Sequence, residues 1–122
     1  MDNDIIIETD EVSQQEAYSK TKVLLSKRSD IDGIFCSADQ LACGALKAIY
    51  ELGISIPGQI RLTGFDDTLL SSSGIIPITT VHQFVDKFGS LGADILTDMI
   101  AGNIPEQKHY TIPVELVKRA ST

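Results

Sequence analysis

The sequence predicts an α/β fold in which a mostly parallel sheet is flanked by helices. Short, buried strands are predicted for the apolar stretches at 5–7, 31–36 and 60–65, and amphipathic segments of ten or more residues separate the first three elements of this series. This alternation is typical of βαβ units. Because such crossovers are right-handed, we expect the three strands to lie parallel, with their carboxyl ends along one edge of the sheet.

Two helices are predicted in the first half of the chain. Ser13 and Glu16 form the Ser-x-x-Glu pattern that satisfies the first amides of a helix, and helical spacing of apolar residues continues until Ser29. The second helix is predicted to begin after Asp39, its natural N-cap, and to end at Gly53.

The second half contains two further strands and one further helix, in the order strand, helix, strand, and the first of these strands starts within 76–83. Residues 68–74 are rich in Ser and are predicted to form a loop or irregular turn. An apolar stripe at helical spacing runs over 85–99 and stops near Gly102. Residues 110–117 are expected to form the last strand, at an edge of the sheet, because Pro113 cannot donate a hydrogen bond to a neighbour.

Length and composition are those of one soluble globular domain. The chain has 122 residues, of which 43% are apolar and 22% charged. No apolar run approaches the roughly 20 residues that cross a bilayer, and the first twelve residues lack the basic start of a secretory signal. We therefore expect a cytoplasmic protein without membrane contact.

Charge and metal-binding residue types exclude several kinds of site. The formal net charge of -7 disfavours direct binding of nucleic acid by this chain. Cys36 and Cys43 have neither zinc-site spacing nor the pattern of a disulfide framework, and we expect buried thiols. His82 and His109 have no other metal-type ligand at useful spacing, so no metal site and no cofactor are predicted.

The residues that end the strands are the candidates for a binding site. The loops at 9–13, 37–39 and 65–68 should share one edge of the sheet, where open α/β folds bind ligands. Asp66 and Asp67 lie in the last of these loops, and a carboxylate there can accept hydrogen bonds from ligand hydroxyls, as sugar sites require. The alternative is that both merely stabilise turns.

No residue pattern specifies an enzyme. Asp39 and Asp66 on the same edge leave a two-carboxylate hydrolase conceivable, although the distance between them decides that mechanism. The serines at 71–73 lack the Gly-x-Ser-x-Gly turn of a catalytic serine, and no glycine-rich phosphate-binding loop is present. We therefore expect a protein without catalytic activity.

Six short motifs, taken in order, resemble the LacI/GalR family of bacterial transcriptional regulators. They are Asp32-Gly-Ile-Phe-Cys-Ser-Ala-Asp39, Ala42-x-Gly44-Ala45-Leu46, Gly53-Ile54 before Ile56-Pro57, Gly64-Phe65-Asp66-Asp67, Pro77-x-Thr79-Thr80-Val81 and Arg119-Ala-Ser-Thr122. The resemblance runs nearly end to end and covers the back half of such a regulator. It implies the C-terminal part of an effector-binding region with the type I periplasmic-binding-protein-like fold.

The resemblance also implies how the chain is divided. Residues 1–76 and 110–122 would belong to the C-terminal effector-binding subdomain, and residues 77–109 to the N-terminal one. The helix-turn-helix domain that binds operator DNA in the family would be absent. Half of an exported solute-binding protein, which shares the architecture, is the alternative interpretation.

For the ligand, the resemblance implies a small effector such as a sugar or a nucleoside. Asp66 matches the acid that hydrogen-bonds the effector, and Gln83 and Val12 align near pocket-lining positions. Ala38 stands where many sugar-responsive relatives have an Asn that contacts the sugar, which removes one hydrogen bond. The arginine that clamps the effector would lie upstream of Met1, so this chain alone is expected to bind ligand poorly.

A homodimer is the partner that the resemblance implies. The family dimerises through the second helix and the loop after the Asp pair. The corresponding residues here are Leu41, Cys43, Gly44, Lys47, Leu69, Leu70, Ser72 and Gly74. Small residues beside the main apolar stripe and a pair of adjacent leucines suit a self-complementary surface.

Overall fold

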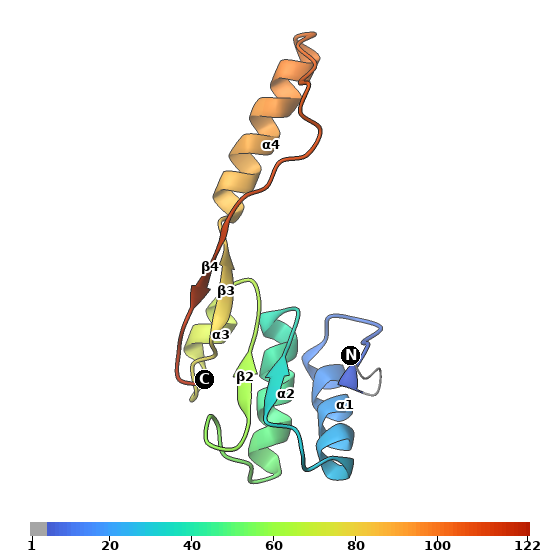
Figure 1. Cartoon of the computed structure of the whole chain (residues 1–122), viewed down its shortest axis with the longest axis vertical. Coiled ribbons are helices and arrows are strands. Elements are labelled where there is room, and N and C mark those ends of the chain that lie inside the picture. The colour runs from blue at the N-terminus through green and yellow to red at the C-terminus, as the bar shows by residue number, and fades with distance from the viewer. Residues whose placement is uncertain (1–4) are drawn as a thin grey trace.

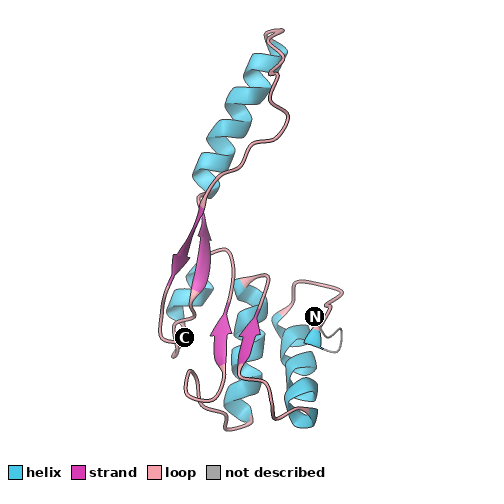
Figure 2. Ribbon diagram, in the orientation of Figure 1, coloured by secondary structure: helices cyan, strands magenta, loops and turns pink. Residues whose placement is uncertain are grey.

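A compact α/β part and a long projecting arm make up the molecule (Figure 1). The structure, a computed structural model, describes residues 5–122. The elements of the described chain are α1 (Gln14–Lys27), β1 (Gly33–Phe35), α2 (Asp39–Glu51), β2 (Arg61–Thr63), α3 (Leu69–Ser73), β3 (Thr80–Gln83), α4 (Val85–Ile100) and β4 (Val114–Val117). The first five lie in the compact part, and α4 forms the far end of the arm (Figure 2).

The strands pair as the sequence predicted for a mostly parallel sheet. β1 and β2 are parallel, with Gly33 opposite Arg61. Two further parallel bridges, Thr63 with Thr79 and Asp66 with His82, connect the end of β2 to β3. β4 is antiparallel to β3, which places it at the edge where Pro113 suggested an edge strand. The strands predicted at 60–65 and 110–117 are shorter in the structure, where pairing is confined to 61–63 and 114–117.

The core lies between α2 and the sheet. Its buried residues are Ala42, Ala45, Ile49, Ile60, Leu62 and Ile78. α1 packs beside α2 at close range: a Cβ at Gly44 would overlap the carbonyl oxygen of Gln14 and would lie 2.9 Å from the Cβ of Ala17. The small residues of α2 therefore make room for α1, and not for a second molecule as the sequence suggested.

The predicted start of α1 is confirmed, with one difference in its capping. Ser13 is the N-cap, and its Oγ accepts a hydrogen bond from the amide of Glu16 at 3.4 Å. The Glu16 carboxylate reaches further back than the usual capping pattern and accepts from the amides of Asp10 and Glu11, at 2.9 and 3.1 Å. These bonds fix the loop that precedes α1.

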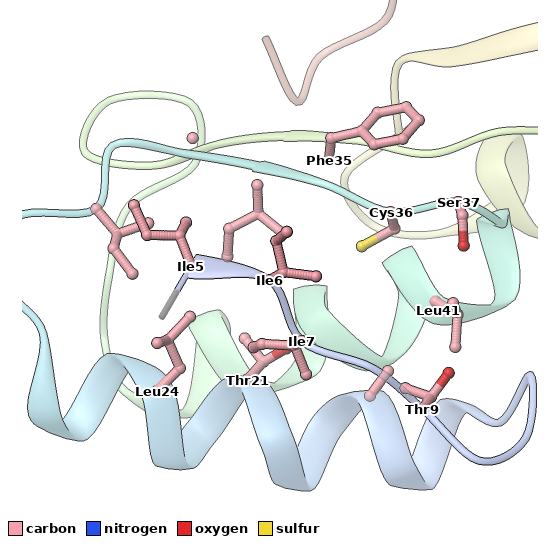
Figure 3. Close-up of a pocket in the computed structure, with 14 residues that line it drawn as sticks. Ile5, Ile6, Ile7, Thr9, Thr21, Leu24, Phe35, Cys36, Ser37 and Leu41 are labelled. Carbon is pink, nitrogen blue, oxygen red and sulfur yellow. The ribbon is translucent and has the colours of Figure 1, made fainter. Parts of the chain in front are cut away.

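The prediction of a buried strand at 5–7 is wrong. Ile5, Ile6 and Ile7 are exposed and lie between α1 and β1, on one side of an apolar hollow of about 420 Å³ (Figure 3). The hydrogen bonds of the following residues explain this position. The Lys20 ammonium donates to the carbonyl of Glu8, and the amides of Asp10 and Glu11 donate to the Glu16 carboxylate. These bonds hold the segment at α1 and not along β1.

Residues 69–73 form the short helix α3, where the sequence predicted a loop. Two serines explain the difference, because their hydroxyls bond carbonyls three residues earlier. Ser71 Oγ donates to Thr68 O at 2.8 Å, and Ser72 Oγ donates to Leu69 O at 3.1 Å. Ser71 is also fully buried, so this Ser-rich stretch is packed and not a solvent-exposed loop.

The third predicted helix is confirmed as α4, but none of its residues is buried. The apolar stripe that includes Phe88, Leu96 and Met99 is about half exposed. The segment therefore forms a helix, but its apolar stripe is not covered by another part of the described chain. No helix in the described range 5–122 combines the length and the hydropathy needed to cross a membrane.

Candidate functional site

The ends of β2 and β3 bring two of the four predicted ligand residues, Asp66 and Gln83, together at one edge of the sheet. Asp66 and Asp67 follow β2, and both have positive φ angles, of 105° and 55°. Hydrogen bonds to β3 fix this turn: the Asp66 amide donates to Val81 O at 3.0 Å, and the Asp67 amide donates to Thr80 Oγ1 at 3.4 Å. The turn directs the two neighbouring carboxylates to different partners.

Asp66 meets Gln83, as the predicted site required. Gln83 Nε2 donates to Asp66 Oδ1 at 2.7 Å, and both residues are half-buried. Among the described residues no donor reaches Asp66 Oδ2, so this oxygen is available to a ligand hydroxyl. The Gln83 amide offers an oxygen acceptor and a second N–H beside it. The pair can therefore recognise a small polyhydroxylated molecule.

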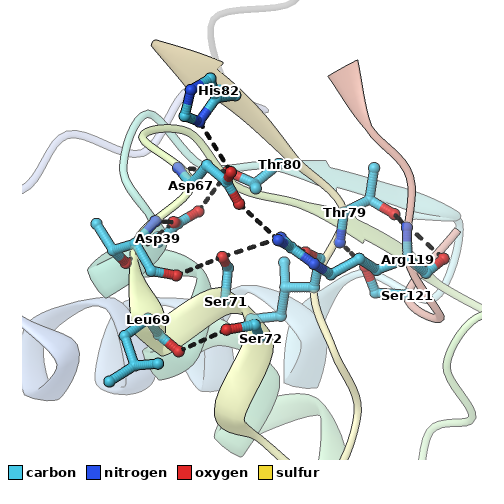
Figure 4. A network of polar contacts seen from close by, with 12 residues as sticks. Asp39, Asp67, Leu69, Ser71, Ser72, Thr79, Thr80, His82, Arg119 and Ser121 are labelled. Atoms are coloured by element: carbon cyan, nitrogen blue, oxygen red, sulfur yellow. Dashed lines mark hydrogen bonds and ion pairs between the residues drawn. The ribbon is translucent and has the colours of Figure 1, made fainter. Parts of the chain in front are cut away.

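Asp67 has a structural role in a polar cluster under the site (Figure 4). Arg119 Nη2 donates to Asp67 Oδ1 at 2.5 Å, and His82 Nδ1 lies 2.9 Å from Asp67 Oδ2. The Arg119 guanidinium above all, with help from His82, holds the pKa of the Asp67 carboxyl below its usual value. Arg119 also donates to Ser71 Oγ and Ile78 O, each at 3.0 Å, so one guanidinium joins three segments.

Asp39 is not the N-cap of α2, contrary to the sequence prediction. Ala38 takes that position without a side-chain cap, and Asp39 is the first helical residue. The Asp39 carboxylate is fully buried and accepts hydrogen bonds from Thr68 N, Thr68 Oγ1 and Thr80 Oγ1, at 2.7, 3.0 and 2.5 Å. These donors lie 29 and 41 residues away, which is why a local pattern did not indicate them.

The other two predicted ligand residues are not joined to the Asp66 pair. The Ala38 side chain is buried in a cluster with Ala17 and Leu41, so it faces α1. Val12 is exposed in the loop before α1. Contact of either residue with a ligand stays a prediction. Within residues 5–122 no group of three or more His, Cys, Asp or Glu side chains could hold a metal ion.

A second surface lies on the other side of α2. The apolar face, as we call it, consists of Cys43, Leu46, Lys47, Tyr50, Leu69, Leu70, Ile75 and Ile76, and six of these residues line a hollow of about 200 Å³. Leu69, Tyr50 and Ile75 are 79%, 72% and 97% exposed. Tyr50 and Ile75 were not predicted for it, although both are apolar residues close to the predicted set in sequence.

Two residues of the predicted dimer surface are turned towards α1 of the same chain. Leu41 is buried with Ala17, and Gly44 faces the backbone of Gln14, so α1 covers both. Cys43, Lys47, Leu69 and Leu70 do lie on the apolar face, and the exposed Ser72 and Gly74 flank it. Cys43 Sγ lies 3.8 Å from Leu70 O, which joins α2 to α3 within the face.

The two cysteines are free and half-buried. Burial raises the pKa of the Cys36 thiol to about 12 and also raises the pKa of Cys43. Both therefore remain protonated thiols near neutral pH.

Comparison with known proteins agrees with this fold. A family model described as periplasmic binding protein-like domain matches residues 2–122. The ribose operon repressor of Halalkalibacterium halodurans is 36% identical over 107 residues, which is 88% of this chain and 32% of that protein. The chain thus spans about a third of the length of the first curated relatives that it matches.

Two solved structures share the fold at 32% identity. The lac repressor dimer bound to operator and the anti-inducer ONPF superposes with a TM-score of 0.84 over 90% of this chain and 38% of that one. A LacI family regulator from Enterococcus faecium with bound ribose gives a TM-score of 0.78 over 90% of this chain and 40% of that one. The chain belongs to the LacI/GalR family of transcriptional regulators, within their periplasmic binding protein-like region.

Proposed function

We propose that this chain is the effector-sensing and dimerisation part of a LacI-type transcriptional repressor, with a small sugar as its effector. The Asp66–Gln83 pair is the observation that carries the proposal. The Asp66 carboxylate is held 2.7 Å from the Gln83 amide nitrogen, and both residues are half-buried at the ends of their strands. A charged acceptor in this position suits a sugar hydroxyl. The ribose operon repressor and the ribose-bound regulator among the relatives support a sugar over a nucleoside.

The site lies where the compact part continues into the arm. Gln83 is the last residue of β3, and α4 begins at Val85. We assign residues 85–109 to a second effector-binding subdomain, and residues 5–84 and 110–122 to the first; the boundary predicted at 77 moves to the end of β3, because Ile78 is buried in the core of the compact part. The uncovered stripe of α4 supports this assignment, because it needs another surface to pack on. A sugar held between the two subdomains would favour one relative arrangement of them. That arrangement would in turn change the DNA affinity of the complete regulator.

The first test is a calorimetric titration of the complete regulator with ribose, lactose and cellobiose in turn. We expect one of these sugars to bind and to shift the side-chain amide signals of Gln83 in an NMR spectrum, because the sugar joins the hydrogen bonds around Asp66. A sugar that binds without moving these signals would place the effector elsewhere. Absence of binding by all three would contradict the assignment of a sugar of these types.

We propose that the apolar face forms the homodimer interface. It joins α2, α3 and the segment after α3, and it presents large apolar side chains that the fold leaves exposed. A two-fold interface uses the same patch on both subunits, so one continuous apolar patch per chain suffices. Lys47 lies at the edge of the apolar face. Its Nζ is 4.9 Å from the centre of the Tyr18 ring, so the lysine charge lies outside the centre of the face.

Leu69→Asp is expected to convert the dimer to monomer, because it places an unpaired charge at the centre of the interface. Sedimentation velocity over a range of protein concentrations measures the change. Val23→Asp is the matched control: Val23 is exposed on α1, away from the apolar face, and its substitution should leave the dimer intact. A Leu69→Asp protein with the same mass as the wild type would contradict the proposed interface.

A hydrolase that uses Asp39 and Asp66 is not supported by the geometry. Both oxygens of the buried Asp39 carboxylate accept hydrogen bonds within the fold, so this carboxylate does not face a substrate. The relatives are transcriptional regulators. We therefore propose a regulator without catalytic activity that acts in the cytoplasm, where its operator is.

A further inference from the structure

The turn that presents Asp66 has a backbone conformation that its own residues disfavour. Asp66 and Asp67 are consecutive residues with φ angles of 105° and 55°, a region in which side chains other than glycine are strained. Such residues persist only where the surrounding structure holds them in place. The groups that hold this turn therefore decide where the Asp66 carboxylate points.

Asp39 contacts the chain on both sides of the turn. Its amide donates to the carbonyl of Phe65 at 2.7 Å, immediately before Asp66. Its Oδ2 accepts from the amide of Thr68 at 2.7 Å, immediately after Asp67. One residue thus fixes both ends of the two-residue turn.

The second oxygen of Asp39 extends this support to β3. Asp39 Oδ1 accepts from Thr80 Oγ1 at 2.5 Å, and Thr80 Oγ1 itself accepts from the amide of Asp67 at 3.4 Å. Gln83, the partner of Asp66, lies on the same strand as Thr80. The carboxylate of Asp39 therefore fixes the turn relative to the strand that carries the second ligand residue.

The surroundings of Asp39 leave it little freedom to move. It is fully buried in the first turn of α2, where the helix amides favour a negative charge. Gly64 packs directly against it, because a Cβ at that position would overlap Asp39 Oδ1. Within the described residues, no buried side-chain nitrogen or oxygen lacks a hydrogen-bond partner.

We propose that Asp39 is a positioning residue of the effector site: it holds the Asp66–Asp67 turn so that the Asp66 carboxylate meets Gln83, and it does not touch the effector. Arg119 holds the opposite side of the same turn through Asp67. The role in effector binding rests on the proposed function, whereas the effect on the turn does not.

The test is an NMR comparison of wild type and Asp39→Ala in the complete chain without any sugar. The three-bond HN–Hα couplings of Asp66 and Asp67 report their φ angles, and the side-chain amide shifts of Gln83 report its bond to Asp66. In Asp39→Ala we expect these couplings to leave their wild-type values, the Gln83 shifts to move toward those of a solvated amide, and the Thr68 amide to exchange at least tenfold faster.

Two further variants separate positioning from general loss of stability. Ile49→Ala makes a cavity in the core on the same helix, and it should leave the Asp66, Asp67 and Gln83 signals unchanged. Asp39→Asn keeps one acceptor for the Thr68 amide and can donate to Thr80 Oγ1, so it should restore most of the wild-type signals. If Asp39→Ala does not fold, Thr68→Val removes one of the three bonds to the Asp39 carboxylate without removing an acceptor of the Asp66 or Asp67 amide, and it should still move the Asp67 coupling.

The proposal is overturned if Asp39→Ala, or Thr68→Val in its place, keeps the wild-type couplings of Asp66 and Asp67. It is also overturned if Ile49→Ala moves these signals as much as Asp39→Ala does. Neither result depends on a sugar, so failure of this proposal and failure of the proposed function are separate findings.

Discussion

Arg119→Met is expected to lower the free energy of unfolding by about 3 kcal/mol, because it leaves the poorly exposed Asp67 carboxylate without its main partner. Ser71 Oγ and Ile78 O also lose a donor, and Met preserves much of the apolar contact of the arginine stem. Chemical denaturation at neutral pH measures the loss.

Lys20→Met is the matched control for this experiment. Lys20 also pairs with a carboxylate, Glu16, but the pair is an exposed one between successive turns of α1. Such surface pairs contribute about 0–1 kcal/mol. Equal losses in Lys20→Met and Arg119→Met would contradict a special role for the Asp67 cluster.

The same cluster should make stability depend on pH in the acid range. The folded-state pKa of Asp67 lies below its usual value, chiefly because of Arg119. Its stabilising contribution is therefore complete above the unfolded pKa, near about pH 4, and is lost as the pH falls through the folded value. We expect the difference between wild type and Arg119→Met to be large at pH 7 and to shrink in denaturation measured well below pH 4.

Asp66→Ala is expected to weaken binding of the effector sugar by roughly tenfold to a hundredfold. Loss of a charged hydrogen-bond acceptor costs about 1.5–3 kcal/mol, and each 1.4 kcal/mol is a factor of ten in affinity. A modest loss of stability is also expected, because Ala tolerates the positive φ angle at this position less well than Asp. Titration calorimetry measures the affinity with the sugar that binds the wild type.

Asp32→Ala provides the control for that titration. Asp32 is an exposed acid before β1, at the opposite end of the strands from Asp66, and its removal changes the net charge equally. Its sugar affinity should equal that of the wild type. An Asp66→Ala protein with unaltered affinity would show that the sugar does not use this carboxylate.

Patterns local in sequence predicted much of the fold and part of the site. The N-cap of α1, the glycine that follows α2 and the apolar spacing of both indicated the two helices, since these signals act within a few residues. The parallel order of β1 and β2 follows from right-handed connection through α2. Asp66 and Asp67 became candidates because ligands gather at the ends of parallel strands, and the family resemblance then selected Asp66.

Long-range contacts explain what the sequence did not predict. Asp39 has the sequence context of an N-cap, but donors from Thr68 and Thr80 determine its role. Arg119 and Asp67 are 52 residues apart, and no spacing connects them. Gly44 was interpreted as room for a partner molecule, whereas α1 of the same chain occupies that space. The direction of packing of a small residue is not contained in its helical spacing.

In the function proposed for this chain, a sugar bound at Asp66 changes the affinity of the regulator for DNA. The most direct test measures operator affinity of the complete regulator with and without the bound sugar, for wild type and for Asp66→Ala. We predict that the sugar changes the wild-type operator Kd by at least about fivefold, and that Asp66→Ala binds operator equally well without sugar but does not respond to concentrations that saturate the wild type. An Asp66→Ala regulator that responds to the sugar as the wild type does would contradict this function.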